Sequence, residues 1–399
     1  MNKFYLLASG VLVLVLIIPL FFWQKVGNVA PALLPPRQDI SEIVPFPLSL
    51  PDGFEIGVFA KNLGNARDLE FSPDGTLLVS IPADGKVVAL PDKDKNGMAD
   101  GNTDVLAMLE RPHGIAFHGG KLFVVEETRV VRYLWDEENL KAVRERVLFN
   151  LPKGGRHFTR SVAFDSKGQM FISLGSSCDV CSESNEWLAA VIVSNPDGEN
   201  PRLWANGLRN SVFITINPET NELWGTEMGR DLLGDALPPD EVNIIRENKG
   251  YGWPKCYGNK KHDKDFDKKP FIEQVVGTLE EVRCGYTESP VYEIPAHSAP
   301  LGLTFINSSQ FPKDWQGDLL VSYHGSWNST KPVGYKVVLL DVDGDTIKGE
   351  EDFITGFLPS GGSSPSQAYG RPVDLAFDKS GSLFISDDKA GIVYKVVKK

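Results

Sequence analysis

Six stretches of the chain repeat one pattern: an apolar segment, a polar turn that usually carries Gly, and a second apolar segment. Each stretch is typical of a β-hairpin whose alternating apolar side chains cannot be buried by that hairpin alone. Stacking the hairpins around an axis buries them all, so the repeat favours a β-propeller over a two-sheet sandwich. The six stretches are Arg67–Ser80, Gly114–Val125, Ser161–Ser173, Val212–Thr226, Gly302–Ser322 and Val373–Ser386.

The spacing of these repeats predicts an all-β, six-bladed propeller over residues 51–399. Successive repeats are first about 45 to 50 residues apart and later further apart, which suits four-stranded blades that carry loop insertions. The strand-like segment Gly53–Ala60 precedes the first repeat and could complete the last blade. That closure would remove two exposed sheet edges.

The N-terminal residues predict export. Phe4–Trp23 is almost uninterrupted apolar sequence and is long enough to cross a bilayer as a helix. Residues 1–28 are therefore a signal peptide or a membrane anchor, and the lack of a convincing cleavage site favours the anchor. The Pro-rich residues 29–50 resemble a tether. We expect a propeller held by a membrane anchor at the periplasmic or extracellular face.

The net charge of the chain limits which classes of molecule it can bind. The chain has 399 residues and a formal net charge of −12, so its overall field repels polyanions. Binding to nucleic acid is therefore not expected. A small neutral or cationic molecule is a better partner.

The four cysteines predict two local disulfides, Cys178–Cys181 and Cys256–Cys284, in an exported chain. A redox-active Cys-x-x-Cys motif is a less favoured alternative, because the pair follows a strand and precedes no evident helix. A zinc site is also less favoured, because only one pair of cysteines has the expected spacing.

A ten-residue acidic turn has the Asp-x-Asp-x-Asn-Gly spacing of a calcium loop. It predicts structural Ca²⁺, although a solvated acidic turn is the alternative because the usual Glu at the twelfth position is missing. Its oxygen-bearing residues are Asp92, Asp94, Asn96 and Asp100. Asp341–Asp345 lacks the later ligands and is expected to be a plain hairpin turn.

Two polar residues that strands rarely contain are candidates for chemistry. His157 and Arg209 each lie just before the apolar strand of a repeat. In a propeller these connections open at one end of the central channel, so the two side chains could converge there. The alternative is that His157 caps a strand and Arg209 pairs with a carboxylate.

Several motifs extend this region into a family resemblance. Residues 50–399 resemble the soluble pyrroloquinoline-quinone (PQQ)-dependent glucose/sorbosone dehydrogenases, most closely the sorbosone-dehydrogenase-like and aldose sugar dehydrogenase branch. The matching motifs, in chain order, are His-x-Thr-Arg at 157–160, Leu-Arg-Asn at 208–210, Glu-Met-Gly at 227–229, Asp-Glu-Val-Asn at 240–243, Tyr-Gly-Trp-Pro at 251–254, Tyr-His-Gly-Ser-Trp-Asn at 323–328 and Tyr-Gly-Arg-Pro-Val-Asp-Leu at 369–375.

The resemblance implies roles for individual residues. His157 falls on the catalytic base, Arg209 on the residue that polarises the quinone, and Asn210 on a further cofactor contact. Arg371 falls on one quinone-carboxylate contact, whereas Val373 replaces a second. Lys336 or Lys331 could supply that charge, although both could equally be solvated lysines at a blade edge.

The resemblance also implies two calcium sites. Backbone carbonyls of Gly229 and Arg230 would hold the catalytic Ca²⁺, and Asp240 with Glu241 resembles a structural site. Gly229 matches the family, whereas Arg230 stands where the family often has Pro. A main-chain ligand tolerates that change.

The expected function is PQQ- and Ca²⁺-dependent oxidation of an aldose-type sugar or sugar aldehyde, with electrons passed to an external acceptor. Two alternatives stay open: a Ca²⁺-dependent lactonase and a non-catalytic recognition propeller. His297 and His324 could line the pocket without an assigned role, and His113, His118 and His262 are expected in turns or at the surface.

Overall fold

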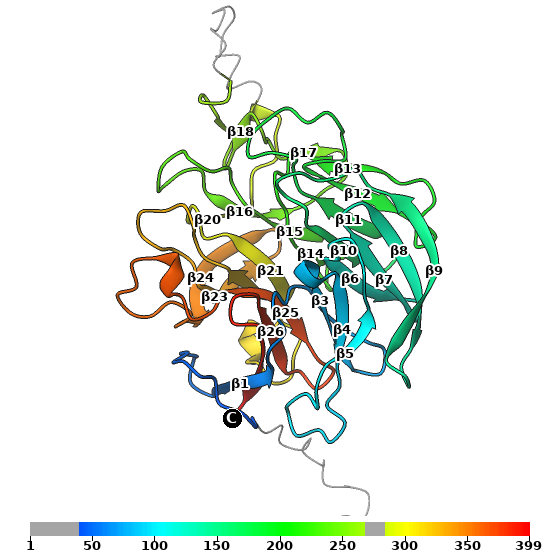
Figure 1. Cartoon of the computed structure of the whole chain (residues 1–399). Helices are drawn as coiled ribbons and strands as arrows, with labels where there is room; N and C mark the ends of the chain where they lie inside the picture. The colour runs from blue at the N-terminus through cyan, green and yellow to red at the C-terminus, as the bar shows by residue number, and fades with distance from the viewer. Residues whose placement is uncertain (1–39, 268–283) are drawn as a thin grey trace, which may run out of the picture. The chain divides into compact units, whose positions relative to one another are not determined.

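The computed structural model describes residues 40–267 and 284–399, in which β-strands predominate (Figure 1). The predicted anchor at 1–28 and residues 29–39 of the predicted tether lie outside these residues. Within the described ranges, no helix has the length and apolar character needed to span a membrane.

Six antiparallel sheets form the blades. Blade 1 contains β2 (Leu69–Phe71), β3 (Leu77–Ile81), β4 (Lys86–Leu90) and β5 (Thr103–Leu106). Blade 2 contains β6 (Gly114–His118), β7 (Lys121–Glu126), β8 (Arg129–Asp136) and β9 (Lys141–Asn150). Blade 3 contains β10 (Arg160–Phe164), β11 (Met170–Leu174), β12 (Ala190–Ser194) and β13 (Arg202–Asn206), to which β17 (Lys249–Gly250) adds in parallel.

Blade 4 contains β14 (Ile214–Ile216), β15 (Leu223–Glu227), β16 (Asp240–Ile244) and β20 (Tyr292–Ile294). Blade 5 contains β21 (Pro300–Phe305), β22 (Leu319–Tyr323), β23 (Lys336–Asp343) and β24 (Thr346–Ile354). Blade 6 contains β25 (Pro372–Phe377), β26 (Leu383–Asp387), β27 (Ile392–Lys398) and β1 (Phe54–Ala60). Outside the blades lie the hairpin β18 (Cys256–Tyr257) and β19 (Lys261–His262), and the 3-10 turns η1 (Pro82–Asp84), η2 (Lys313–Trp315) and η3 (Pro365–Gln367).

The first strands of the six repeats form a closed ring. Neighbours in the circular order β2, β6, β10, β14, β21, β25 contact one another, and β25 returns to β2. All six strands line one cavity of about 440 Å³, which is the central channel. The predicted six-bladed propeller is therefore confirmed.

Strand β1 comes from the start of the described propeller and completes blade 6, which otherwise consists of the last three strands. It pairs antiparallel with β27, with Phe54 opposite Lys398 and Val58 opposite Tyr394. Figure 1 shows β1 close to the C-terminus. Blade 6 therefore combines both ends of the described propeller, as the sequence predicts. The pairing removes the free edges that β27 and β1 would otherwise expose.

The core lies between the blades because each central strand is apolar on both faces. In β3, Leu77 and Val79 pack toward blade 6 with Phe384, whereas Leu78 packs toward blade 2 with Leu122. Successive side chains point to opposite faces of a strand, so one strand joins two inter-blade cores.

Two glycines let the inner strands approach one another. A Cβ on Gly114 would lie 2.6 Å from the carbonyl oxygen of Arg160, and a Cβ on Gly302 would lie 2.6 Å from the Cα of Asp374. Larger residues would push neighbouring blades apart at the channel.

The propeller unit begins earlier than the sequence predicts. Val44 is buried among residues of blades 5 and 6, and Phe46, Leu48 and Leu50 pack against the same cluster. Residues 40–50 were expected in the tether, but their apolar side chains are held by the propeller, whose compact unit begins at Ile40.

Both predicted disulfides are confirmed: Cys178–Cys181 lies between β11 and β12, and Cys256–Cys284 lies in the long insertion between β16 and β20. His113 was expected in a turn or at the surface; it lies just before β6, but it is fully buried, and its Nδ1–H donates to the carbonyl of Arg160 at 3.1 Å.

Carboxyl groups join the inner strands around the channel. Asp68 accepts the N–H of Ile115 at 3.1 Å, and Asp374 accepts the N–H of Leu69 at 2.8 Å. Burial raises the pKa of Asp374 to about 7 and that of Asp68 well above its usual value, and each is close to the other. The pair therefore holds a proton in the folded state at pH values where both groups ionise in the unfolded chain.

A pH dependence of stability follows from this pair. Because the folded state binds more protons between about pH 4 and pH 7, its free energy of unfolding should fall as pH rises through this range. Asp374→Asn keeps an acceptor for Leu69 and removes the paired acid, so it should flatten that slope. Chemical denaturation of both proteins at several pH values measures the effect, and an unchanged slope would contradict it.

Candidate active site

A second cavity of about 500 Å³ lies where the loops enter the inner strands. The loops before five of those strands contribute to its lining through Arg67, His157, Arg209, Ala299 and Arg371. The sequence prediction that His157 and Arg209 converge at one end of the channel is therefore confirmed.

His157 is held by a hydroxyl group that fixes its tautomer. Its Nδ1 lies 2.8 Å from the Oγ of Ser176, and that hydroxyl donates its only proton to the carbonyl of Cys178 at 2.6 Å. Ser176 Oγ must therefore accept a hydrogen bond from Nδ1–H. The Nε2 atom of His157 consequently carries a lone pair and can act as a base.

The surroundings of His157 keep it neutral. Burial lowers its pKa to about 3, and the charges of Arg209 and Arg156 act in the same direction. Gly175 makes the close packing possible, because a Cβ there would lie 2.6 Å from the Cβ of His157 and 2.7 Å from the Oδ1 of Asn210.

Arg209 is buried and held by acceptors on two loops. Its Nε–H donates to the carbonyl of Asp179 at 2.8 Å, and its Nη2 donates to the Oδ1 of Asp179 at 2.7 Å and to the Oδ2 of Asp231 at 3.4 Å. Its Nη1 donates to the carbonyl of Met228 at 3.2 Å. Burial opposes the charge of Asp179, but the Asp231 N–H and Arg209 bring its pKa below the usual value.

Two other residues of the cavity lining, Arg67 and His324, share the carboxylate of Asp388. Asp388 accepts from Arg67 Nη1 at 2.8 Å and from His324 Nε2 at 2.8 Å. Burial opposes ionisation of Asp388, yet His324 and Arg67 hold its pKa below its usual value. Burial lowers the pKa of His324, although Asp388 opposes the shift.

Arg371 completes the cationic lining. Its Nε–H donates to the carbonyl of His324 at 3.0 Å and its Nη2 to the carbonyl of Gly325. Both partners are neutral, so hydrogen bonding fixes the guanidinium without cancelling its charge. Sequence reasoning missed the Arg67–Asp388 pair, which joins residues 321 positions apart.

The residues predicted to bind calcium differ in whether their oxygen atoms already accept hydrogen bonds. No hydrogen bond within residues 40–267 and 284–399 reaches the carbonyl oxygens of Gly229 or Arg230, and Gly229 lines the cavity. Asp240 is different: its Oδ1 accepts the N–H of Gly229 and its Oδ2 the N–H of Ala299, both at 2.9 Å. Asp240 thus supports the loop that carries Gly229.

Glu241 faces a separate, small cavity of about 20 Å³ together with Glu227 and Asp263. Burial raises the pKa of Glu227 to about 8 and that of Glu241 to about 7. Asp263 pairs with Arg230 at 2.9 Å. Among the described residues, these three carboxyl groups do not gather within 4.8 Å of one another.

The acidic turn folds onto its own backbone. Asp92 accepts the N–H groups of Asn96 and Gly97, each at 3.0 Å, and Asp100 accepts the N–H of Lys93 at 2.9 Å. Asp94 accepts from the side chain of Asn96 at 2.9 Å. Among the described residues, the carboxylates of this turn do not gather within 4.8 Å of one another.

Lys336 lies on β23 and pairs with Glu350 at 3.0 Å and with Asp352 at 2.6 Å. Among the described residues that line the 500 Å³ cavity, neither Lys336 nor Lys331 is present. The neighbouring strand β24 supplies both partners of Lys336.

The fold and the cavity define a six-bladed propeller with a neutral histidine and several arginines at one end of its channel. The chain belongs to the TrAA12-like family, whose model matches residues 48–399. The predicted family resemblance is thereby confirmed.

Three similar proteins illustrate this relationship. An uncharacterized protein of Borreliella burgdorferi is 31% identical over 367 residues, which are 88% of this chain and 90% of that protein. The pyrroloquinoline quinone-dependent pyranose dehydrogenase of Coprinopsis cinerea is 22% identical over 410 residues, 88% of this chain but only 54% of that protein. The calcium structure of the Trichoderma reesei family AA12 enzyme has a TM-score of 0.76 at 21% identity, and the match covers 90% of this chain and 99% of that one.

The positive charge of the arginines near His157 should be detectable when its imidazole ring is titrated. In the protein without added ligands, the ring should stay neutral down to about pH 4, one unit above its pKa of about 3. Arg209→Gln removes a cation, so the midpoint should rise. NMR of the histidine rings measures it, with His157→Gln to assign the signal; an ordinary midpoint near pH 6.5 would contradict the account.

Proposed function

We propose that this protein is a quinoprotein sugar dehydrogenase that oxidises an aldose-type sugar or sugar aldehyde with PQQ and Ca²⁺. The observation that carries the proposal is the neutral His157, with a free Nε2 lone pair, beside Arg209 in a cavity of about 500 Å³. Membership of the TrAA12-like family and the names of the relatives support the same reading.

The cavity fits a small polyanion such as the tricarboxylate PQQ. Arg67, Arg156, Arg209 and Arg371 all line it. The Nε of Arg67 is buried without a hydrogen-bond partner among the described residues, which leaves a donor for a ligand. Arg371 keeps its full charge because its partners are carbonyls. Asn210 also lines the cavity and would be a further contact.

PQQ, when bound, would supply the oxidising chemistry by accepting hydride from the substrate carbon. The chain's own part is proton transfer and orientation. The Nε2 of His157 would accept the proton of the substrate hydroxyl, while Ser176 holds the ring by its Nδ1–H. The guanidinium of Arg209 would stabilise negative charge that develops in the cavity during reduction.

For Ca²⁺ we propose two kinds of site. The carbonyls of Gly229 and Arg230 would hold a catalytic ion, since among the described residues they accept no hydrogen bond. Glu241 would contribute to a structural ion in the small cavity, whereas Asp240 supports the first site through the N–H of Gly229. The turn with Asp92, Asp94, Asn96 and Asp100 is proposed as a further structural site.

The cellular setting is also proposed. Two disulfides favour a location outside the cytosol, at the periplasmic or extracellular face. The reaction requires an external electron acceptor, because each turnover removes two electrons from the sugar. Anchoring through residues 1–28 stays a prediction from the sequence.

A reconstitution experiment tests the function and its alternatives together. The purified protein is incubated with PQQ and Ca²⁺, and sugar-dependent dye reduction is followed beside lactone hydrolysis. Dye reduction that requires both additions supports the dehydrogenase. Lactone hydrolysis alone would support the lactonase alternative, and neither activity would favour a recognition propeller.

His157→Ala should lower turnover by roughly 10²-fold or more, the usual scale for a lost general base, while PQQ still binds. Steady-state dye reduction and a PQQ absorption titration separate the two effects. Near-normal turnover in this variant would contradict the assignment of His157.

Removal of Ca²⁺ should have two effects, because the proposed ions serve different sites. Chelation should abolish activity and lower the melting temperature. The double variant Asp92→Asn/Asp94→Asn should reproduce only the loss of stability. Asp341→Asn/Asp343→Asn, in another acidic turn, is the matched control. Loss of activity at unchanged melting temperature in the first variant would contradict the structural role.

A further inference from the structure

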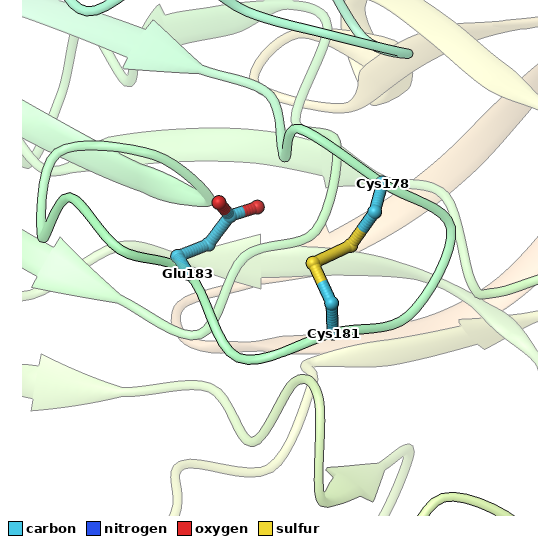
Figure 2. Close-up of side chains that lie close together, drawn as sticks. All are labelled: Cys178, Cys181 and Glu183. Carbon is cyan, nitrogen blue, oxygen red and sulfur yellow. A yellow bond between two sulfur atoms is a disulfide. The ribbon is translucent and has the colours of Figure 1, made fainter.

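The loop Ser176–Glu183 between β11 and β12 is closed by the Cys178–Cys181 disulfide. Figure 2 shows the disulfide with Glu183 beside it, on the same loop. The carboxylate of Glu183 lies within 4.8 Å of both sulfur atoms. It also accepts the N–H of Ser177 at 2.7 Å and the hydroxyl of Ser177 at 2.8 Å. The loop is therefore cross-linked twice, by a covalent bond and by a carboxylate.

This loop touches the machinery of the cavity along its length. Ser176 accepts the Nδ1–H of His157 and donates to the carbonyl of Cys178, which is itself in the disulfide. The N–H of Ser176 donates to the carbonyl of Arg209 at 2.7 Å. The carbonyl of Ser177 accepts the N–H of Arg156 at 2.9 Å.

Asp179, which lies inside the disulfide ring, makes an ion pair with Arg209. Its carbonyl accepts the Nε–H of Arg209 and its carboxylate accepts from Nη2, so both acceptors lie along one edge of the guanidinium. The same carboxylate accepts the N–H of Asp231 at 3.0 Å, and the Asp179 carbonyl also accepts the indole N–H of Trp253 at 3.3 Å. Asp179 thus links Arg209 to the loop that follows β15.

We propose that the Cys178–Cys181 loop is the positioning element of this site: Ser176 fixes the tautomer of His157, Asp179 orients Arg209, and the disulfide holds both in register. The inference rests on the proposed function of the cavity. Neither cysteine lines the cavity among the described residues, so the disulfide acts through Ser176 and Asp179.

The setting of the disulfide suits a permanent constraint. Reduction must release a thiolate, and the carboxylate of Glu183 close to both sulfurs disfavours that negative charge. A cross-link over a separation of three residues leaves the backbone of Asp179 few conformations. Its removal should loosen the loop while the hydrogen-bonded blades stay intact.

The first test reads the tautomer of His157 in the protein without added cofactor, by ¹⁵N NMR of the histidine rings. The wild type should show Nδ1–H alone. Ser176→Ala should give a mixture of both tautomers, and Ser176→Thr, which keeps the hydroxyl, should restore the Nδ1–H form. An unchanged tautomer in Ser176→Ala would overturn the role of Ser176.

The second test compares Asp179→Asn and Cys178→Ser/Cys181→Ser with Asp197→Asn. Asp197 pairs with Arg132 at 2.7 Å, the same distance as the Asp179–Arg209 pair, but Arg132 does not line the cavity whereas Arg209 does. The two loop variants should lower kcat about 10-fold or more at a nearly unchanged melting temperature, whereas the control should not. Wild-type kcat in both loop variants would overturn the proposal.

The two tests separate the positioning claim from the proposed function. If Ser176→Ala and the cysteine variant, read by the same ¹⁵N NMR, both change the tautomer but no sugar is oxidised, the loop positions His157 and the proposed function fails. If the cysteine variant does not fold, Ser176→Ala and Asp179→Asn still decide the roles of Ser176 and Asp179, since both keep the disulfide.

Discussion

Closure of the ring by the pairing of β1 with β27 is the constraint on which the rest of the structure depends. Six hairpins with apolar faces can bury those faces only against neighbours on both sides, and the last blade needs a strand from the start of the chain. Once the ring is closed, the inner strands share one channel, and the loops that enter them must meet at one end. Residues far apart in sequence become neighbours there.

At this point of convergence, few residues are candidates for the chemistry, and a larger number hold those residues in position. His157 offers one lone pair, and Arg209 offers one charge. Around them, Ser176, Asp179 and Asp231 hold specific atoms in place by hydrogen bonds. On another part of the lining, Asp388 holds Arg67 and His324 in the same way. The support comes from loops whose ends are fixed by the blades, so the cationic cavity is largely preformed.

The sequence predicted what depends on periodicity and missed what depends on side-chain contacts. Alternating apolar residues predicted the blades, and the position of His157 and Arg209 before inner strands predicted their convergence. Residues 40–50 were assigned to a tether because their prolines are typical of a linker. The apolar residues among them nevertheless pack on the propeller. Lys336 was one of two lysines that could supply a missing cofactor contact, whereas the register of β23 and β24 sets it beside two acidic residues. Asp179 gave no signal, because its importance lies in contacts across 30 residues.

The central claim is that hydride leaves a sugar carbon while His157 takes the proton from its oxygen. Single-turnover absorption spectroscopy of the protein loaded with PQQ and Ca²⁺, mixed with sugar in the absence of an acceptor, tests this most directly. We expect one equivalent of sugar to reduce the bound quinone, and deuterium at the oxidised carbon to slow that reduction. A loaded protein whose spectrum does not change with any aldose or sugar aldehyde would contradict the account.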